Sequence, residues 1–237
     1  MSRRSVFSML FVVVLLGAGF FAWNVFSYYN QIVHGTLSLE DIPSYSFADK
    51  LTTSRLARAM ATEAPTTANV VTTDDPSIGS MNAPLTIVEF ADFECPYSEE
   101  VSYVVRRAAE QFPNLVRIIY RDYPLVDIHP SAELAAEAGG CANEQGKFWE
   151  FHDKLFANQA DLSREAMIGY AESLGMSRQK FESCLNSGKY EEEVAEDMLD
   201  GTAAGVYGTP TFFFNGHRIE GAIPEATFEK IISAFSK

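Results

Sequence analysis

The residues best suited to chemistry form one short motif, Cys95-Pro96-Tyr97-Ser98, which closely follows the apolar segment 85–91. This pattern predicts a buried strand that leads into a helix beginning at Pro96. The unpaired N–H groups and the positive dipole end of a helix start stabilise a thiolate, the reactive form of cysteine. We therefore predict that Cys95 is a nucleophile at a helix N-terminus. A buried structural cysteine is the alternative.

Glu89 is the second candidate, because it is the only ionisable residue in the segment 85–91. Burial within a strand raises the pKa of a carboxyl group and suits it to proton transfer. We expect Glu89 to handle the proton of the reaction at Cys95, directly or through water. The alternative is a strand-end glutamate that reaches solvent.

The spacing of apolar side chains predicts the elements that position these two residues. Between residues 101 and 112, apolar residues recur at helical intervals. The segment 115–120 has the continuous apolar character of a second buried strand. Residues 85–120 are therefore expected to form a β-α-β unit, with Cys95 where the first strand meets the helix.

The middle of the chain is expected to be helical, and its end to return to β structure. The predicted helices cover 131–143, 147–156 and 163–175, followed by two that begin after Ser177 and Gly188. Strands at 211–214 and 217–219 flank Asn215-Gly216, a hairpin-turn dipeptide, and a last helix starts at Pro224. This order predicts one α/β domain with a helical insertion at about 128–205.

Five segments resemble the DsbA-like branch of the thioredoxin superfamily, and they occur in the order found in that family. They are TIVEFADFECPYS (86–98), YRDYPL (120–125), CANEQGKFWEFHDKLF (141–156), GVYGTPTFFFNG (205–216) and IEGAIP (219–224). The resemblance extends over about 75–237. It implies an α/β thioredoxin fold with an inserted helical domain, and thiol–disulfide exchange outside the cytoplasm. It implies no metal and no organic cofactor.

The resemblance also implies roles for single residues. Pro210 matches the cis-proline of the family, whose loop lies against the active-site cysteine and docks a substrate strand together with Thr209. Pro96 and Tyr97 are implied to contact the same substrate from within the motif. The family carries an acid beneath the active site, at the position of Glu89.

The motif departs from the family at Ser98, which replaces the second cysteine of C-x-x-C. A serine cannot close an active-site disulfide. Cys95 would instead form a mixed disulfide with a client protein or a small thiol, and an external thiol would resolve it. The Ser98 hydroxyl is expected to hydrogen-bond the Cys95 thiolate. We predict a monothiol oxidoreductase that acts as a reductase or isomerase.

Two functions of other classes fit the same substitution. One is a non-catalytic thioredoxin-fold protein that binds clients, and the other is a peroxidase that uses Cys95 alone. An engineered variant that traps mixed disulfides would also carry Ser98.

The chain has three cysteines, and the remaining two, Cys141 and Cys184, lie in the predicted helical insertion. We expect a structural disulfide that joins two inserted helices, which is typical of proteins outside the cytoplasm. A second redox pair that resolves Cys95 and two free buried thiols are the alternatives.

The N-terminal part predicts a membrane location. Residues 6–26 contain no charged side chain, follow Arg3 and Arg4, and precede a stretch without Lys or Arg up to Lys50. At about 1.5 Å per residue, such a helix crosses a bilayer, with its N-terminus in the cytoplasm. We favour an uncleaved signal anchor over a cleaved signal peptide, because no small-x-small cleavage site follows.

The expected organisation is therefore a cytoplasmic tip and transmembrane anchor (1–27), a linker (28–80) and a DsbA-like thioredoxin domain (81–237). The domain would lie outside the cytoplasm on a single-pass membrane protein, with a membrane redox partner within reach. Across its 237 residues the chain carries 18 Lys and Arg against 32 Asp and Glu, a net charge of −14. This balance excludes general nucleic-acid binding, which requires clustered cations.

Overall fold

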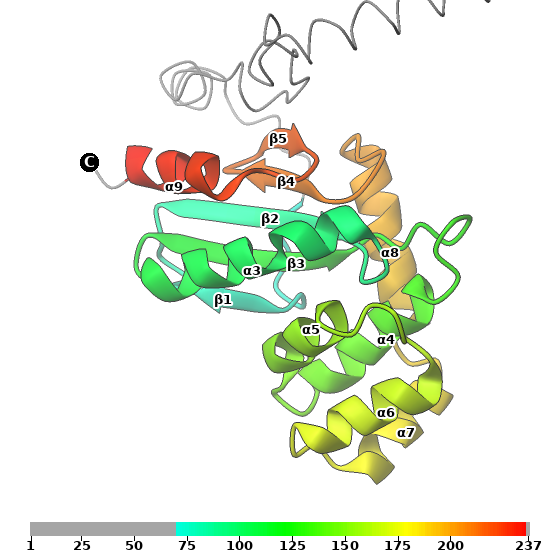
Figure 1. Cartoon of the computed structure of the whole chain (residues 1–237). Helices are drawn as coiled ribbons and strands as arrows, with labels where there is room; N and C mark the ends of the chain where they lie inside the picture. Colours follow the sequence, from blue (N-terminus) through cyan, green and yellow to red (C-terminus); the bar gives the residue numbers. More distant parts are fainter. Residues whose placement is uncertain (1–69, 236–237) are drawn as a thin grey trace, which may run out of the picture. The chain divides into compact units, whose positions relative to one another are not determined.

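The computed structural model describes residues 70–235, and its centre is one five-stranded sheet. In chain order, the strands are β1 (Ser77–Gly79), β2 (Leu85–Ala91), β3 (Val116–Asp122), β4 (Thr211–Phe214) and β5 (His217–Glu220). Their order in the sheet is β1-β3-β2-β4-β5 (Figure 1). Strands β2 and β3 pair in parallel, and the other neighbours are antiparallel. The predicted β-α-β unit is therefore confirmed.

Helices cover the two faces of this sheet. Helix α3 (Pro96–Gln111) and helix α9 (Glu225–Ala234) share one apolar cluster with the side chains of Leu85 and Ile87. The opposite face, which includes Val88 and Phe90, packs against residues of and after α8 (Glu191–Ala203). Because side chains alternate along a strand, Glu89 lies on the face that carries α3.

The helical insertion forms a compact group beside the sheet (Figure 1). It contains α4 (Ala132–Asn143), α5 (Phe148–Phe156), α6 (Arg164–Ser173) and α7 (Arg178–Asn186), and α8 leads from this group back along the sheet (Figure 1). Buried aromatic and aliphatic side chains of α4 to α7 share one core with Phe93 and Tyr120 of the sheet region. Cys141 of α4 and Cys184 of α7 are joined by a disulfide with an S–S distance of 2.02 Å.

Local sequence signals set several element boundaries. The side chains of Ser163 and Ser177 accept hydrogen bonds at the starts of α6 and α7, which completes these helix N-termini. Asn215 and Gly216 both have positive φ, at 48° and 86°, as a type I′ hairpin turn requires. Pro224 is the residue before α9 and not its first helical residue as predicted.

The N-terminal limit of the fold differs from the predicted linker of 28–80. Strand β1 lies within that range and pairs with β3, and Val70 and Asp75 are buried. A three-residue strand carries too little apolar pattern to be found from sequence. Residues 6–26, the predicted anchor, lie outside the described residues. Within 70–235, no helix is long and apolar enough to cross a membrane.

Candidate functional site

Cys95 lies at the junction predicted for it, between β2 and α3. It is the N-cap residue of α3, with φ −77° and ψ 123°, and Pro96 occupies the first turn. Its carbonyl accepts hydrogen bonds from the N–H groups of Ser98 and Glu99, each at 3.1 Å. Cys95 is the one cysteine outside the disulfide, and it is only 3% exposed. The thiol is therefore single, shielded and adjacent to the positive end of a helix dipole.

A second chain segment lies against the thiol. The peptide bond between Thr209 and Pro210 is cis, and the Cys95 Sγ donates to the Thr209 carbonyl at 3.3 Å. The loop is anchored by two hydrogen bonds: Thr211 Oγ1 donates to Gly208 O at 2.7 Å, and Gly221 N donates to Pro210 O at 2.8 Å. The hydroxyl oxygen of Thr209 is buried and has no hydrogen-bond partner among the described residues.

Ser98 is completely buried one helical turn after Cys95. Its hydroxyl oxygen accepts a long hydrogen bond from Asp92 N at 3.5 Å, while the thiol of Cys95 donates to Thr209. The hydroxyl hydrogen is not used in that contact, since the oxygen acts as acceptor. The Ser98 side chain is thus held in place within the motif, and its hydroxyl hydrogen remains available as a hydrogen-bond donor.

Asp92 anchors the loop that carries Cys95. One carboxylate oxygen accepts from Glu94 N at 2.7 Å, and the other accepts from Leu125 N at 2.9 Å and binds His129 Nδ1 at 2.7 Å. Glu94 in turn accepts from Ser131 N at 2.6 Å. Two carboxylates therefore fasten the active-site loop to the segment after β3. No sequence pattern predicts this clamp as a whole, although an Asp that accepts from the N–H two residues later is a common turn.

Gln159 supports the same loop from the helical insertion. Its Nε2 donates to the carbonyl oxygens of Phe93 at 3.0 Å and Cys95 at 2.9 Å. No sequence signal marks this residue, because it lies in an irregular segment between α5 and α6. The contact ties the helical insertion directly to the backbone of the nucleophile.

Glu89 is buried in the centre of the sheet, between Tyr120 of β3 and Phe212 of β4. Both carboxyl oxygens are buried and have no hydrogen-bond partner among residues 70–235. Burial raises the pKa of Glu89 to about 8. The side chain therefore carries a proton at neutral pH, which is the state that a proton donor needs.

The surface near the thiol displays large apolar side chains. Tyr97, in the motif itself, is 63% exposed, and Tyr207, in the segment that leads to Pro210, is 82% exposed. Ile128 is also exposed, in the segment that the Asp92 clamp holds. On the flank of α3, a groove of about 410 Å³ is bordered by Tyr103, Arg106 and Asp153.

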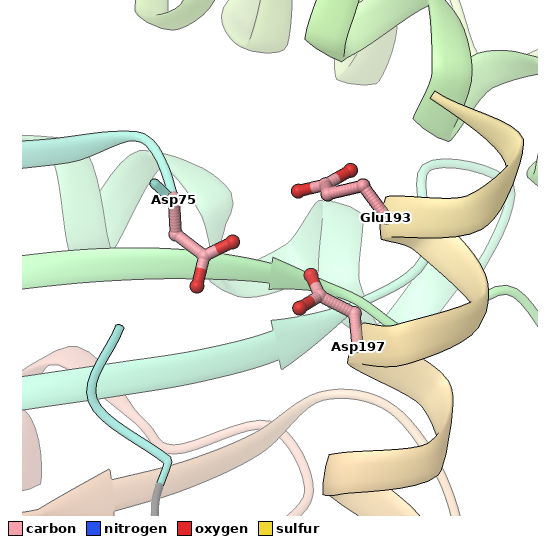
Figure 2. Close-up of side chains that lie close together, drawn as sticks. All are labelled: Asp75, Glu193 and Asp197. Carbon is pink, nitrogen blue, oxygen red and sulfur yellow. The ribbon is translucent and has the colours of Figure 1, made fainter. Parts of the chain in front are cut away.

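An acidic cluster lies on the other face of the sheet. Figure 2 shows Asp75 facing Glu193 and Asp197 of α8, and the nearest oxygens of the three lie within 4.8 Å of one another. The guanidinium of the buried Arg121 binds Asp75 at 3.2 Å, Asp197 at 2.8 Å and Asp200 at 2.9 Å. Because this cation is already present among the carboxylates, we assign no metal here.

The acidic residues of α8 are mostly exposed, but one of them is buried. Six of the residues at 191–200 are acidic, a pattern that predicts a solvated helix face, and Glu191, Glu192, Glu196 and Asp200 are exposed. Asp197 is instead buried against Arg121, and its carboxylate also accepts from Asp122 N at 2.8 Å. Burial and the neighbouring carboxylates raise the pKa of Asp75 to about 8 and of Glu193 to about 7.

Comparisons with known proteins agree with this architecture. A family model described as thioredoxin matches residues 71–234. A thioredoxin-like oxidoreductase from Silicibacter pomeroyi has a TM-score of 0.63 and 23% identity, over 72% of this chain and 96% of that one. The thiol-disulfide exchange protein alpha-DsbA2 from Wolbachia pipientis has a TM-score of 0.64 and 18% identity, over 75% and 95%. These structures share the fold with this chain.

Two curated relatives are named as Na(+)/H(+) antiporters. A Na(+)/H(+) antiporter NhaA 1 from Salinispora arenicola is 38% identical over 197 residues, and an NhaA 3 from Salinispora tropica is 37% identical over 197 residues. The match covers 81% of this chain but only 30% of either relative. This chain is therefore similar to a segment of those proteins.

Proposed function

We propose, because this chain belongs to the thioredoxin family, that it performs thiol–disulfide exchange through the single thiol of Cys95. The observation that supports the proposal best is the meeting of two distant segments: the Cys95 thiol at the start of α3 and the Thr209 carbonyl before the cis-proline. Ser98 occupies the position where a dithiol enzyme carries its second sulfur.

In the proposed reaction, the Cys95 thiol first loses its proton and attacks one sulfur of a client disulfide. The client S–S bond breaks, a Cys95–client disulfide forms, and the other client sulfur leaves as a thiolate that takes up a proton. For a reduction, an external thiol attacks the Cys95 sulfur and releases the client thiol, and a second external thiol then frees Cys95, so that the two external thiols leave as their own disulfide. For an isomerisation, a second thiol of the client attacks the client sulfur of the mixed disulfide, forms a new client disulfide and releases Cys95.

Glu89 is proposed to accept the Cys95 proton in its ionised form, a minor form at neutral pH because its pKa is about 8, and to return a proton to the sulfur of Cys95 when the mixed disulfide is resolved. Ser98 is proposed to donate its hydroxyl hydrogen to the thiolate once the thiol no longer binds the Thr209 carbonyl.

The client is proposed to be a cysteine-containing protein segment. The exposed Tyr97 and Tyr207 supply apolar contacts, Pro96 shapes the start of α3, and the orphan hydroxyl of Thr209 beside Pro210 supplies a polar one. The backbone of a client that lies along this loop would hydrogen-bond that hydroxyl. Such a bond would remove the free-energy cost of leaving a buried polar group unpaired.

A membrane location is proposed for the whole chain. Residues 6–26 would form a signal anchor with the N-terminus in the cytoplasm and the thioredoxin domain outside. Protease added to intact cells should digest the domain. Digestion only after lysis would contradict this topology.

The function is tested by mixing the reduced full chain with glutathione disulfide and measuring intact masses. One glutathione should attach to Cys95 and leave on addition of free glutathione, whereas Cys95→Ala should acquire none there. Ser98→Cys should instead close an intramolecular disulfide and resist the adduct. Equal labelling of wild type and Cys95→Ala would contradict the proposal.

A second candidate function is client binding without turnover, which the exposed aromatic residues at the site favour. Retention of an unfolded, cysteine-free client by both wild type and Cys95→Ala, without any reduction of disulfide clients by wild type, would support binding over catalysis.

A further inference from the structure

Within the described residues, three neighbouring buried side chains in the core behind the active-site loop lack hydrogen-bond partners. Both carboxyl oxygens of Glu89, the hydroxyl of Tyr120 and Nε2 of His152 are buried without a partner in the described part of the chain. Most buried polar atoms in proteins are hydrogen-bonded to protein or to water. Three unpartnered groups in one region therefore require an explanation.

These three side chains lie next to one another. Glu89 and Tyr120 are direct neighbours in the β2–β3 register, with side chains on the same face. The rings of Tyr120 and His152 are perpendicular, with centroids 5.3 Å apart. Phe93, two residues before Cys95, stacks on Tyr120 at 5.1 Å and contacts His152 edge-on at 5.9 Å. Glu89, Tyr120 and His152 therefore form a row that begins beside the active-site loop and continues into the helical insertion.

The far end of the row reaches solvent. His152 Nδ1 binds Asp153 Oδ1 at 2.9 Å, and the Asp153 side chain is 46% exposed in the groove beside α3. Arg106 Nε donates to both carboxylate oxygens of Asp153, at 3.2 and 3.1 Å. Asp153 is thus a carboxylate that accepts from Nδ1–H, which leaves Nε2 of His152 as an acceptor facing the interior.

The hydrogen-bonding capacities of the row complement one another. A protonated Glu89 and the Tyr120 hydroxyl can each donate and accept, whereas Nε2 of a neutral His152 can only accept. Burial lowers the pKa of His152, which keeps the ring neutral. These three groups do not hydrogen-bond one another directly. Water can donate and accept hydrogen bonds, so it is the partner that could bridge them.

We propose that buried water joins Glu89, Tyr120 and His152 into a proton path that ends at Asp153. A proton that leaves Glu89 enters at one end as another leaves Asp153 for solvent, and no electrons move. The path gives Glu89 a route to solvent that does not pass through Cys95. Its use in catalysis rests on the proposed function, but its existence does not.

The test is the rate at which the acid proton of Glu89 exchanges for deuterium. Infrared spectroscopy of the full chain detects the C=O stretch of a protonated carboxyl, and Glu89→Gln assigns that band by removing it. After transfer to D₂O, Tyr120→Phe and His152→Phe should slow the band shift about tenfold, the effect of a barrier higher by about 1.4 kcal/mol. Both substitutions retain the aromatic packing.

Tyr123→Phe is the matched control. Tyr123 is also buried, but its hydroxyl donates to Val206 O at 2.9 Å, so its loss should leave the exchange rate unchanged. Amide exchange recorded on the same samples identifies any variant that opens more often. If His152→Phe fails to fold, Tyr120→Phe and Asp153→Asn still decide the question.

Exchange in Tyr120→Phe and Asp153→Asn as fast as in wild type would overturn the path, as would a wild type without a Glu89 band. The measurement uses the resting protein without client. Loss of reaction with glutathione disulfide would therefore reject the proposed function and leave the path standing, and the converse also holds.

Discussion

Glu89 combines two properties that rarely occur together: it is buried, and neither carboxyl oxygen has a hydrogen-bond partner within residues 70–235. An ionised carboxylate in such a place is costly, so the folded protein holds the neutral acid. The pKa is about 8 in the folded chain against an ordinary value of 4.5. The folded state therefore binds a proton that the unfolded state releases over the range between these values.

The first prediction concerns the pH dependence of stability. As pH rises from about 4.5 to about 8, wild type should lose stability relative to Glu89→Gln, by at most about 1.4 kcal/mol per pH unit. Above pH 8 the difference should become constant. Urea unfolding of both proteins across this range measures it, with the exposed Glu192→Gln as control. A pH-independent difference would show that Glu89 titrates normally.

At the scale of elements, the active site depends on segments that carboxylates hold together. The loop before α3 is joined to the segment after β3 where Asp92 and Glu94 accept hydrogen bonds from Leu125, His129 and Ser131. A negative charge on either acid would by itself oppose a thiolate at Cys95. Their engagement with backbone N–H groups and His129 gives them a positioning role instead.

The second prediction is that Asp92→Asn costs about 1–3 kcal/mol, because one buried acceptor becomes a donor without a partner. The same change should slow alkylation of Cys95 by iodoacetamide, since the loop that positions the thiol loosens. Asp127→Asn, in the same segment but exposed, is the control and should alter neither quantity. Unchanged alkylation in a destabilised Asp92→Asn would limit the clamp to a structural role.

The third prediction concerns the disulfide between α4 and α7, which closes a loop with a sequence separation of 43. Replacement of both Cys141 and Cys184 by alanine should reduce the free energy of unfolding by roughly 2–4 kcal/mol. The Cys95 adduct with glutathione should still form. Failure of that adduct in a folded double variant would instead indicate that the pair resolves Cys95.

At the scale of the whole molecule, the acidic cluster joins the first described residues to α8, which is more than 110 positions later in the chain. Arg121 of β3 binds Asp75 before β1 and Asp197 and Asp200 of α8. The carboxylates outnumber this single cation, and burial together with the neighbouring carboxylates raises the pKa values of Asp75, Glu193 and Asp197. The guanidinium of Arg121 therefore offsets part of the repulsion between these neighbouring carboxylates.

The fourth prediction is that Arg121→Met costs about 3–5 kcal/mol, the usual effect of removing one partner from a buried ion cluster. The loss should be larger at pH 8 than at pH 5, because the carboxylates ionise as pH rises. Arg178 also binds three carboxylates but is 41% exposed, so Arg178→Met should cost less than about 1 kcal/mol. Equal losses in urea unfolding would contradict this account.

The sequence by itself determined the strand-to-helix junction at Cys95, the β-α-β unit, the helical insertion and the hairpin at Asn215. These features depend on residues close together in the chain, through apolar periodicity, helix caps and turn conformation. The burial of Glu89 followed in the same way from its apolar strand.

Only the tertiary structure decided which polar groups meet. The Asp92 clamp, the Gln159 contact, the row from Glu89 to His152 and the Arg121 cluster all join residues far apart in the chain. A charged residue on an amphipathic helix looks solvated in sequence, and Asp197 is buried because a particular arginine from another strand faces it. Electrostatic and hydrogen-bonding partners depend on distance in space, which local sequence patterns do not encode.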